Sequence, residues 1–426
     1  MAALGSMLIL FMALAVPIGI ALAGASVLYI LYDPMLSPAS VFRSFFSFLN
    51  SYTLMAVPFF IYTGFLMEKT GLIGKLFQLA DALIGWVPGG FAYATLMACV
   101  MFGAISGSST AMAAAMGVIA YPEMIKRGYP VWMAAGVIAC GGGIALLIPP
   151  SIALILFGIL TEESIVSLFF AGFVPGLMLA ISDAVIIVFA AWYLGLPAGK
   201  FDARYLLRSF LEAGPALLMP VIVLGGLYGG LFTPTEAGAA ACGYAVIYGL
   251  IAKRGQFVRE LLPVTFRAVN LTSVVFFLVG CVGVFQFLLA NKGWPQDIAI
   301  WVNALNLSPM GFLVILLLVL LFLSMWLTGV AILVLTVPIF FPVAVVLDID
   351  PIHLGILVTI AIEMGGVIPP VGLNLFAVSG TTGVPLAKVM QGAIPFVITD
   401  GIVLILVLFF PILALVVPNM MIKSVF

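Results

Sequence analysis

Charged residues are scarce in this chain. Only 7% of its 426 residues are Asp, Glu, Lys or Arg, while 65% are hydrophobic, and the mean hydropathy is +1.35. Because soluble domains carry about 25% charged residues, this composition excludes a soluble protein and indicates an integral membrane protein. The net charge of −1 provides no basic surface, so we expect no nucleic-acid partner.

The residues of enzyme chemistry are also few. His353 is the only histidine, and no two cysteines have the CxxC spacing of a metal or redox site. The pairs Gly74-Lys75 and Gly199-Lys200 lack the other residues of a phosphate-binding loop. We therefore expect neither an ATPase nor a membrane-embedded enzyme. The four cysteines, all in apolar segments, are Cys99, Cys140, Cys242 and Cys281.

Long hydrophobic runs are what the chain has instead. About 20 apolar residues can cross a bilayer core as a helix, and no run here alternates in polarity as a barrel strand does. We therefore predict an all-α polytopic membrane protein. The first run lacks a basic region and a cleavage site, so it is interpreted as a retained helix rather than a signal peptide. Runs of this kind are Leu8–Tyr32, Pro215–Leu231, Ala237–Ala252, Leu271–Ala290 and Phe312–Leu347.

The two halves of the chain repeat one pattern. A double proline at 149–150 recurs at 369–370, and a Pro-x-Gly-Phe motif at 88–91 recurs at 309–312, which are offsets of 220 and 221 residues. Such constant offsets predict an internal duplication, with one copy in residues 1–213 and the other in residues 214–426. Further pairs with offsets of 220 to 222 are Gly172 with Gly392, Pro175 with Pro395, Pro130 with Pro351, and Ser106-Gly107 with Thr328-Gly329.

The distribution of basic residues indicates that the two copies are inverted. Cytoplasmic loops of membrane proteins are enriched in Lys and Arg. If the basic cluster from Lys253 to Arg267 is cytoplasmic, counting spans outward places twelve basic residues inside and three outside. The same count places both ends of 88–122 inside and both ends of 309–342 outside. The three outside residues are Arg43, Lys292 and Lys423.

Segments 88–122 and 309–342 each begin and end on one side, so we predict two re-entrant helical hairpins. Their turns are GAISGSSTA at 103–111 and LTGVA at 327–331. Polar, non-helical backbone at membrane depth requires a covering of protein or a water-filled cavity. The alternative is a small-residue motif for helix packing. Amphipathic arms at 72–86 and 295–306 precede the two hairpins and could link fixed scaffold helices to a mobile part.

Two broken helices are predicted at 130–160 and 351–380. Proline has no N–H, so the double prolines leave the carbonyls of residues 145–146 and 365–366 without their helical donors. The preceding glycines favour unwinding there, and each new half-helix begins with free N–H groups. Paired breaks of this kind are typical of transporter binding sites. They occur in two inverted copies rather than as one filter per subunit, which argues against an ion channel.

Together, the GAISGSSTA hairpin tip and the two IPP breaks at 148–150 and 368–370 resemble the large membrane subunit of the tripartite ATP-independent periplasmic (TRAP) transporters. The resemblance covers essentially the whole chain. It implies an elevator-type secondary transporter in the bacterial inner membrane, which uses a sodium gradient to take up an organic anion. Its implied partners are a small four-helix membrane subunit and a periplasmic binding protein. Sialic acid is the favoured substrate, with C4-dicarboxylates and 2-oxo acids as alternatives. The competing interpretation is a stand-alone sodium-coupled carboxylate symporter of a related fold.

The resemblance also implies where the ligands bind. Two sodium ions would each lie between a hairpin turn and an unwound backbone segment, where oxygen atoms suit a hard cation. The anion would lie between the two hairpin tips, held by hydroxyls and helix N-termini because no Lys or Arg is present in either motif. The implied first sodium site comprises Ser106, Gly107, Ser108, Gly142, Gly143 and Ala145. The implied second site comprises Thr328, Gly329, Gly365, Gly366, Val367 and Thr381. The implied substrate residues are Ser106, Ser109, Thr110, Ser151 and Asn374.

Four titratable residues within apolar segments leave their roles open. Glu363 could support the second sodium site electrostatically or could be a paired structural acid. Asp183 and Asp400 are expected at helix-packing or interfacial positions. We expect His353 to be interfacial rather than a proton relay, because it follows Pro351 at the start of a helix.

Overall fold

The computed structural model describes the chain except residues 1, 15, 107–108, 295–296, 299, 301–306, 370 and 426, and it describes no side chains at 2–3, 103–106 and 422–425. The described residues contain helices and no strand, which confirms the all-α prediction. Five helices, α11, α12, α13, α16 and α19, are long and apolar enough to cross a membrane, and a sixth candidate span is a pair bent by 59°.

The N-terminal helices depart from the prediction in one respect. The run Leu8–Tyr32 is not one helix, because α1 ends at Ala13 and α2 begins at Ile18, after Pro17. Proline lacks the N–H that a continuous helix requires, and α1 packs against α2. The pair bent by 59° comes next and consists of α3 and the segment from η1 to α4. The elements of this region are α1 (Ala2–Ala13), α2 (Ile18–Tyr32), α3 (Ala39–Leu49), the 3₁₀ turn η1 (Tyr52–Met55) and α4 (Ala56–Thr70).

Helix α5 (Leu72–Ile84) coincides with the first predicted arm. Its apolar side chains are buried against α6 and α12, as expected for an amphipathic helix. The second predicted arm, 295–306, lies almost entirely outside the described residues.

Both predicted hairpin segments contain two consecutive helices. In the first, α6 (Gly90–Ser106) is followed by α7 (Ser109–Ile119) and a short α8 (Tyr121–Lys126). In the second, α15 (Pro309–Ser324) is followed by α16 (Gly329–Val346). The second hairpin continues four residues beyond the predicted end at Pro342.

The two predicted helix breaks are also present. In the first half, α9 (Val131–Ile144) is separated from α10 (Ile152–Thr161), and in the second, α17 (Pro351–Gly365) is separated from α18 (Leu373–Thr382). Each pair is followed by a long helix, α11 (Ile165–Leu194) or α19 (Leu386–Phe409). Helices α17, α18 and α19 begin 220, 221 and 221 residues after α9, α10 and α11.

Two long helices follow α11, and α20 (Ile412–Val425) ends the chain. The first is α12 (Ala203–Tyr228), and the second is α13 (Pro234–Asn291). The runs Ala237–Ala252 and Leu271–Ala290 both lie in α13, which contains a kink at Arg254 with φ 47° and ψ −126°. The kink divides this 58-residue element into two helices, so it can include two separate spans.

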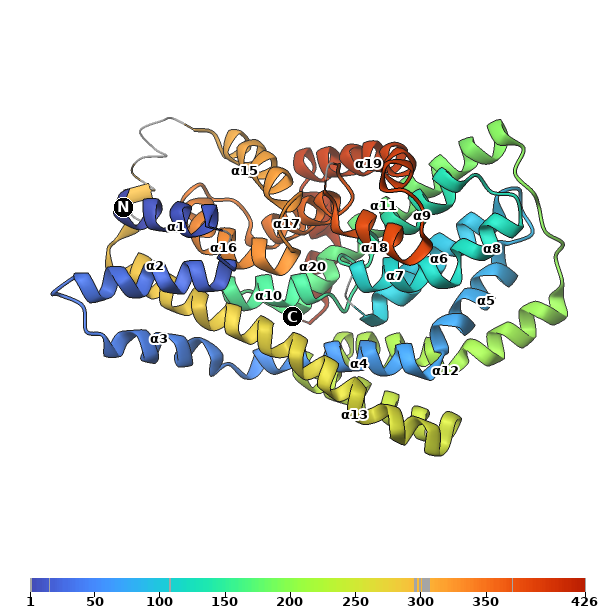
Figure 1. Cartoon of the computed structure of the whole chain (residues 1–426), viewed down its shortest axis with the longest axis horizontal. Helices are drawn as coiled ribbons and strands as arrows, with labels where there is room; N and C mark the ends of the chain where they lie inside the picture. Colours follow the sequence, from blue (N-terminus) through green and yellow to red (C-terminus); the bar gives the residue numbers. More distant parts are fainter. Residues whose placement is uncertain are drawn as a thin grey trace.

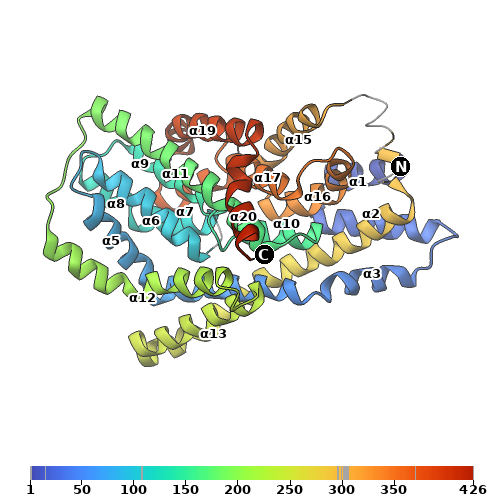
Figure 2. The ribbon, with the colours of Figure 1, turned by 180° about the vertical axis from the view of Figure 1, so that it is seen from behind.

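The helices form two layers. In Figure 1, α3, α4, α12 and α13 lie along the lower side, and the hairpins and broken helices lie above them. Within the upper layer, α9 packs against α19, α7 against α18, and α15 against α17. Seen from behind, α20 crosses the middle of the molecule and contacts α11 (Figure 2). Elements of the two halves are therefore interleaved rather than separate.

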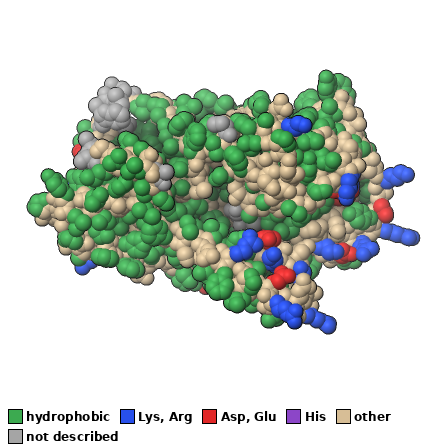
Figure 3. All heavy atoms as spheres, viewed as in Figure 1, with side chains coloured by type: hydrophobic (Ala, Val, Ile, Leu, Met, Phe, Trp, Pro, Cys, Tyr) green, Lys and Arg blue, Asp and Glu red, His purple; other side chains and the backbone are tan. Residues whose placement is uncertain are grey.

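Basic side chains gather at one end of the molecule (Figure 3). Lys253 donates to the carbonyl oxygen of Lys69 at 2.6 Å, and Arg267 lies 3.6 Å from Glu68. The positive-inside count assigned these segments to one side of the membrane. Lys292, assigned to the other side, instead pairs with Asp33.

Candidate anion-binding cavity

A cavity of about 300 Å³ lies between the two layers. The lower layer contributes only apolar side chains to it, from α4 and α13. The upper layer contributes both hairpin turns and both helix breaks. The lower-layer lining is Ile61, Leu271, Val274, Val275 and Leu278; the upper-layer lining includes Ser109, Thr110, Leu146, Ile152, Ala153, Ser324, Thr328, Gly329, Leu373 and Asn374.

Four helices begin at this cavity. Its wall contains the first residues of α7, α10, α16 and α18, which are 11, 10, 18 and 10 residues long. The first N–H groups of a helix have no partner within that helix, and each N-terminus carries about half a positive charge. Because the described lining contains no Lys or Arg, these helix termini are its principal source of positive potential.

The first hairpin tip meets the broken helix of its own half. A Cβ on Gly142 would lie 2.9 Å from the carbonyl oxygen of Ser109 and 3.2 Å from Nδ2 of Asn374. Glycine therefore permits a close approach among α9, α7 and α18. Of the other predicted residues in this tip, Ser106 ends α6 without a described side chain, while Gly107 and Ser108 lie outside the described residues.

The unwound segment of the first break is shorter than expected. Gly142 and Gly143 are still helical, since α9 continues to Ile144, and the break runs from Ala145 to Ser151. The carbonyls of Gly143 and Ile144 accept hydrogen bonds from the turn that follows. Within the described part of the chain, no hydrogen bond ends on the carbonyls of Ala145 and Leu146, as the double proline predicts.

Ser151 is at the predicted position but plays a structural role. Its side chain is fully buried, and its Oγ accepts a hydrogen bond from the N–H of Leu154 at 3.3 Å. It is therefore the N-cap of α10. The cavity wall at this point is formed by the next residues, Ile152 and Ala153.

The second hairpin tip also meets its own broken helix. Gly365, at the end of α17, packs so closely against Ser324 that a Cβ added to Gly365 would overlap the Ser324 side chain. A Cβ added to Gly329 would lie 2.8 Å from the side chain of Ile362. Thr328 is the N-cap of α16 and accepts from the N–H of Ala331 at 3.4 Å. Sequence reasoning missed Ser324, which lies one helical turn before the LTGVA turn.

The second break offers fewer free carbonyls than predicted. The carbonyl of Gly366 is not free, because it accepts the N–H of Asn374 at 3.0 Å. No hydrogen bond among the described residues ends on the carbonyls of Gly365 or Val367. Thr381 is not brought to this break, because it lies in the last turn of α18 and its hydroxyl donates to the carbonyl of Ala377 at 2.8 Å.

Asn374 connects the two halves at the cavity. Its side chain is 1% exposed, and Nδ2 donates to the carbonyl of Ala139 on α9 at 3.3 Å. The other side-chain atom, Oδ1, is buried without a protein partner. A buried amide oxygen without a partner costs about 1–3 kcal/mol, so this atom is available to a bound ligand or water.

The carboxyl group of Glu363 lies against Gly143 in the last turn of α9, although Glu363 belongs to the second half. A Cβ on Gly143 would overlap it. Asp183 on α11 and Asp400 on α19 interact electrostatically with Glu363, and all three side chains are about 1% exposed. Asp183 and Asp400 therefore occupy helix-packing positions rather than interfacial ones. His353 is buried too, 2.8 Å from the carbonyl oxygen of Val407, and its position at the membrane interface stays a prediction.

Comparisons with known proteins identify relatives over most of the chain. The family described as "Tripartite ATP-independent periplasmic transporter, DctM component" matches residues 6–413. The C4-dicarboxylate TRAP transporter large permease protein DctM of Pseudomonas aeruginosa is 41% identical over 86% of each chain. The sialic acid TRAP transporter large permease protein SiaM of Vibrio cholerae is 34% identical over 87% of each chain.

A solved structure has a similar fold. The Alcanivorax borkumensis YdaH transporter superposes with a TM-score of 0.63, over 87% of each chain and at 12% identity. This likeness concerns the fold alone. It is consistent with an all-helical architecture that transporters use.

Proposed function

Because the chain belongs to the DctM component family of the tripartite ATP-independent periplasmic transporters, we propose that it takes up organic carboxylates with the energy of a sodium gradient. It is a multi-pass protein of the inner membrane and a transporter permease, not an enzyme. We propose the cavity between the two layers as the place where the carboxylate binds.

The observation that carries this proposal is the convergence of four helix N-termini on one cavity. Their partial charges favour an anion, and the N–H groups of their first residues that no cap or turn uses can donate to carboxylate oxygens. The hydroxyls of Ser109, Thr110 and Thr328 and the amide of Asn374 line the same space. A site without a Lys or Arg side chain also releases an anion more readily, which a transporter requires.

A C4-dicarboxylate is the substrate to test first, in place of sialic acid. Two features support this order: the higher identity to the Pseudomonas aeruginosa DctM protein and the mostly apolar wall of the cavity. A sugar acid with many hydroxyls would leave polar groups unpaired against Leu271, Val274 and Leu278. A small diacid can direct both carboxylates toward the upper layer.

We place the two coupling sodium ions behind the hairpin tips. The first would lie among the Ser106–Ser109 tip, the end of α9 at Gly142–Gly143 and the unpaired carbonyl of Ala145. The second would lie between Thr328-Gly329 and the unpaired carbonyls of Gly365 and Val367. Neutral oxygen ligands of this kind suit a hard monovalent cation. The second site excludes Thr381, which lies in the last turn of α18, and the carbonyl of Gly366, which already accepts the N–H of Asn374.

We further propose that residues 1–213 and 214–426 are inverted repeats and that the upper layer moves as an elevator along α4 and α13. The near-constant spacing of α9–α11 and α17–α19 supports the duplication. The smooth apolar wall of Ile61, Val274 and Val275 supports sliding, because it makes no hydrogen bond that translation would break. A small membrane subunit and a periplasmic binding protein would complete the transporter.

Reconstituted uptake tests this proposal. The full chain, co-purified with its small subunit, is placed in liposomes and supplied with succinate, sialic acid or a 2-oxo acid, with and without the binding protein. We expect accumulation of one carboxylate that requires both the binding protein and an inward sodium gradient. Uptake without the binding protein would favour the stand-alone symporter, and uptake driven by protons alone would remove the sodium sites.

A further inference from the structure

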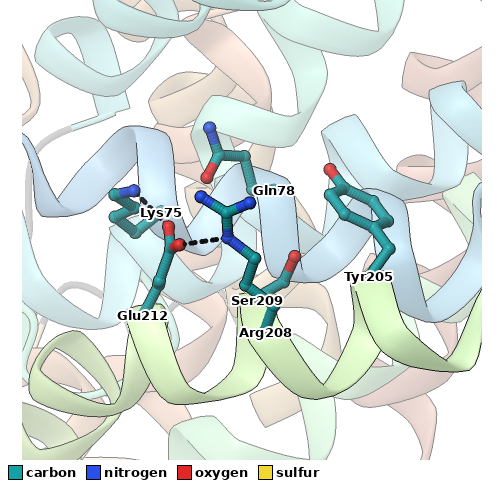
Figure 4. Close-up of a pocket in the computed structure, with 6 residues that line it drawn as sticks. All are labelled: Lys75, Gln78, Tyr205, Arg208, Ser209 and Glu212. Carbon is teal, nitrogen blue, oxygen red and sulfur yellow. Dashed lines mark hydrogen bonds and ion pairs between the residues drawn. The ribbon is translucent and has the colours of Figure 1, made fainter.

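A second cavity, of about 260 Å³, lies away from the candidate substrate site, between the arm α5 and the first three turns of α12. Figure 4 shows Lys75 and Gln78 facing Tyr205 and Arg208 across it. Ser209 and Glu212 complete the lining. Every one of these six side chains carries a polar group, so the cavity is built for a polar ligand rather than an acyl chain.

The charges in this cavity do not balance. Glu212 is the only acid in the lining, and it pairs with both cations: with Lys75, and with Arg208 at 2.7 Å. One positive charge therefore remains without a counter-ion in the described lining. The hydroxyls of Tyr205 and Ser209 and the amide of Gln78 add neutral donors. This donor set suits a singly charged oxyanion such as a phosphodiester.

The surroundings place the cavity at the depth of lipid headgroups. Trp86 after α5 and Phe201 before α12 pack edge to face, with ring centroids 6.1 Å apart, and both are exposed. Exposed aromatic pairs of this kind are typical of the membrane–water interface. The cavity also lies at the end where basic residues gather, which the positive-inside rule makes cytoplasmic (Figure 3).

Helix α12 also carries an exposed apolar strip on its other face. Leu207, Leu211 and Leu218 are spaced along one face of α12, and they are 62%, 68% and 46% exposed. The opposite face of α12 carries Ser209 and Ala213 and is buried.

We propose that this cavity binds the phosphate group of an anionic phospholipid from the cytoplasmic leaflet. The phosphate replaces Glu212 as the acceptor of some of the hydrogen bonds that Lys75 and Arg208 donate. It thereby connects α5 to α12. Basic pockets between membrane helices on the cytoplasmic side bind anionic headgroups in this manner. The inference does not depend on which substrate the protein carries.

The test measures lipid binding to the full chain co-purified with its small subunit in detergent. Phosphatidylglycerol is titrated, and the bound fraction is read by native mass spectrometry. A Lys or Arg near an anionic lipid surface contributes about fivefold in affinity, and two contribute roughly 30-fold. Arg208→Gln should therefore weaken binding about fivefold, and Lys75→Gln combined with Arg208→Gln about 30-fold.

The direction of the change in lipid affinity in Glu212→Gln is the decisive result. It removes the acid that competes with phosphate, so we expect binding to strengthen about fivefold, although both internal ion pairs are lost. A purely structural ion-pair cluster predicts weaker or unchanged binding in the same variant, and that result would overturn the proposal. Arg208→Gln and Glu212→Gln decide the matter even if the double variant cannot be purified.

Two controls separate the site from general charge and from free phosphate. Lys126→Gln with Arg259→Gln removes the same charge from exposed positions at the same end and should leave binding within twofold. An equal loss in this control would overturn the site. Inorganic phosphate at the lipid's concentration should not displace phosphatidylglycerol, and displacement would overturn the assignment to a lipid.

Discussion

Asn374 offers the sharpest test of the anion cavity. Asn374→Asp keeps the size of the side chain but introduces a negative charge at the N-terminus of α18. Two unit charges about 6 Å apart at an effective dielectric constant of about 20 repel by about 2.8 kcal/mol. This energy corresponds to roughly a 100-fold loss of apparent affinity for an anionic substrate.

The charge effect can be separated from the lost hydrogen bond. Asn374→Leu removes the donation to Ala139 without adding charge, so it should reduce stability by about 1–3 kcal/mol with a smaller loss of affinity. Asn291→Asp is the matched control, because Asn291 is exposed and also donates to a backbone carbonyl, that of Phe287. The assay is uptake against substrate concentration at saturating sodium. Equal losses in Asn374→Asp and Asn374→Leu would refute an anion at this helix terminus.

Three further predictions concern stability and the second hairpin. Gly143→Ala should abolish or strongly reduce the yield of folded protein, because the new Cβ overlaps a buried carboxyl group, whereas Gly74→Ala, with open space around it, should leave the thermal midpoint unchanged or higher. Thr328→Ala should lower stability by about 0.5–2 kcal/mol, because it removes an N-cap, and should also raise the apparent KM for the substrate. The N-cap variant Ser308→Ala should lower stability without changing KM. Equal KM values in the two variants would count against a position of Thr328 at the cavity. Arg254→Gly should raise the thermal midpoint, because φ 47° with ψ −126° is a conformation that glycine adopts with less strain; a lower midpoint would show that no strain is stored there.

The fold was largely predictable because the residues that interrupt its helices act locally. Proline and glycine act on the backbone within a few residues, so the separation of α9 from α10 and of α17 from α18, and the division of each hairpin into two helices, could be located from sequence. The same local effect was overlooked at Pro17, which divides the first apolar run into two helices.

The site was predictable only in part, because its contacts are long-range. No sequence pattern indicates that Glu363 lies against Gly143, or that Asn374 donates to Ala139, 235 residues away. The wall formed by residues 271, 274, 275 and 278 has helical spacing, but a lipid-facing stripe has the same spacing. For Ser151, the sequence predicted the position but not the role, because its hydroxyl accepts a hydrogen bond from the backbone of α10.

Density for the bound substrate tests the central claim most directly. The measurement is cryo-electron microscopy of the full chain with its small subunit, saturated with the transported carboxylate and sodium. We predict carboxylate density in the cavity, within hydrogen-bonding distance of the first N–H groups of at least two of α7, α10, α16 and α18. Substrate density outside this cavity, or a carboxylate held by a Lys or Arg side chain, would contradict the account.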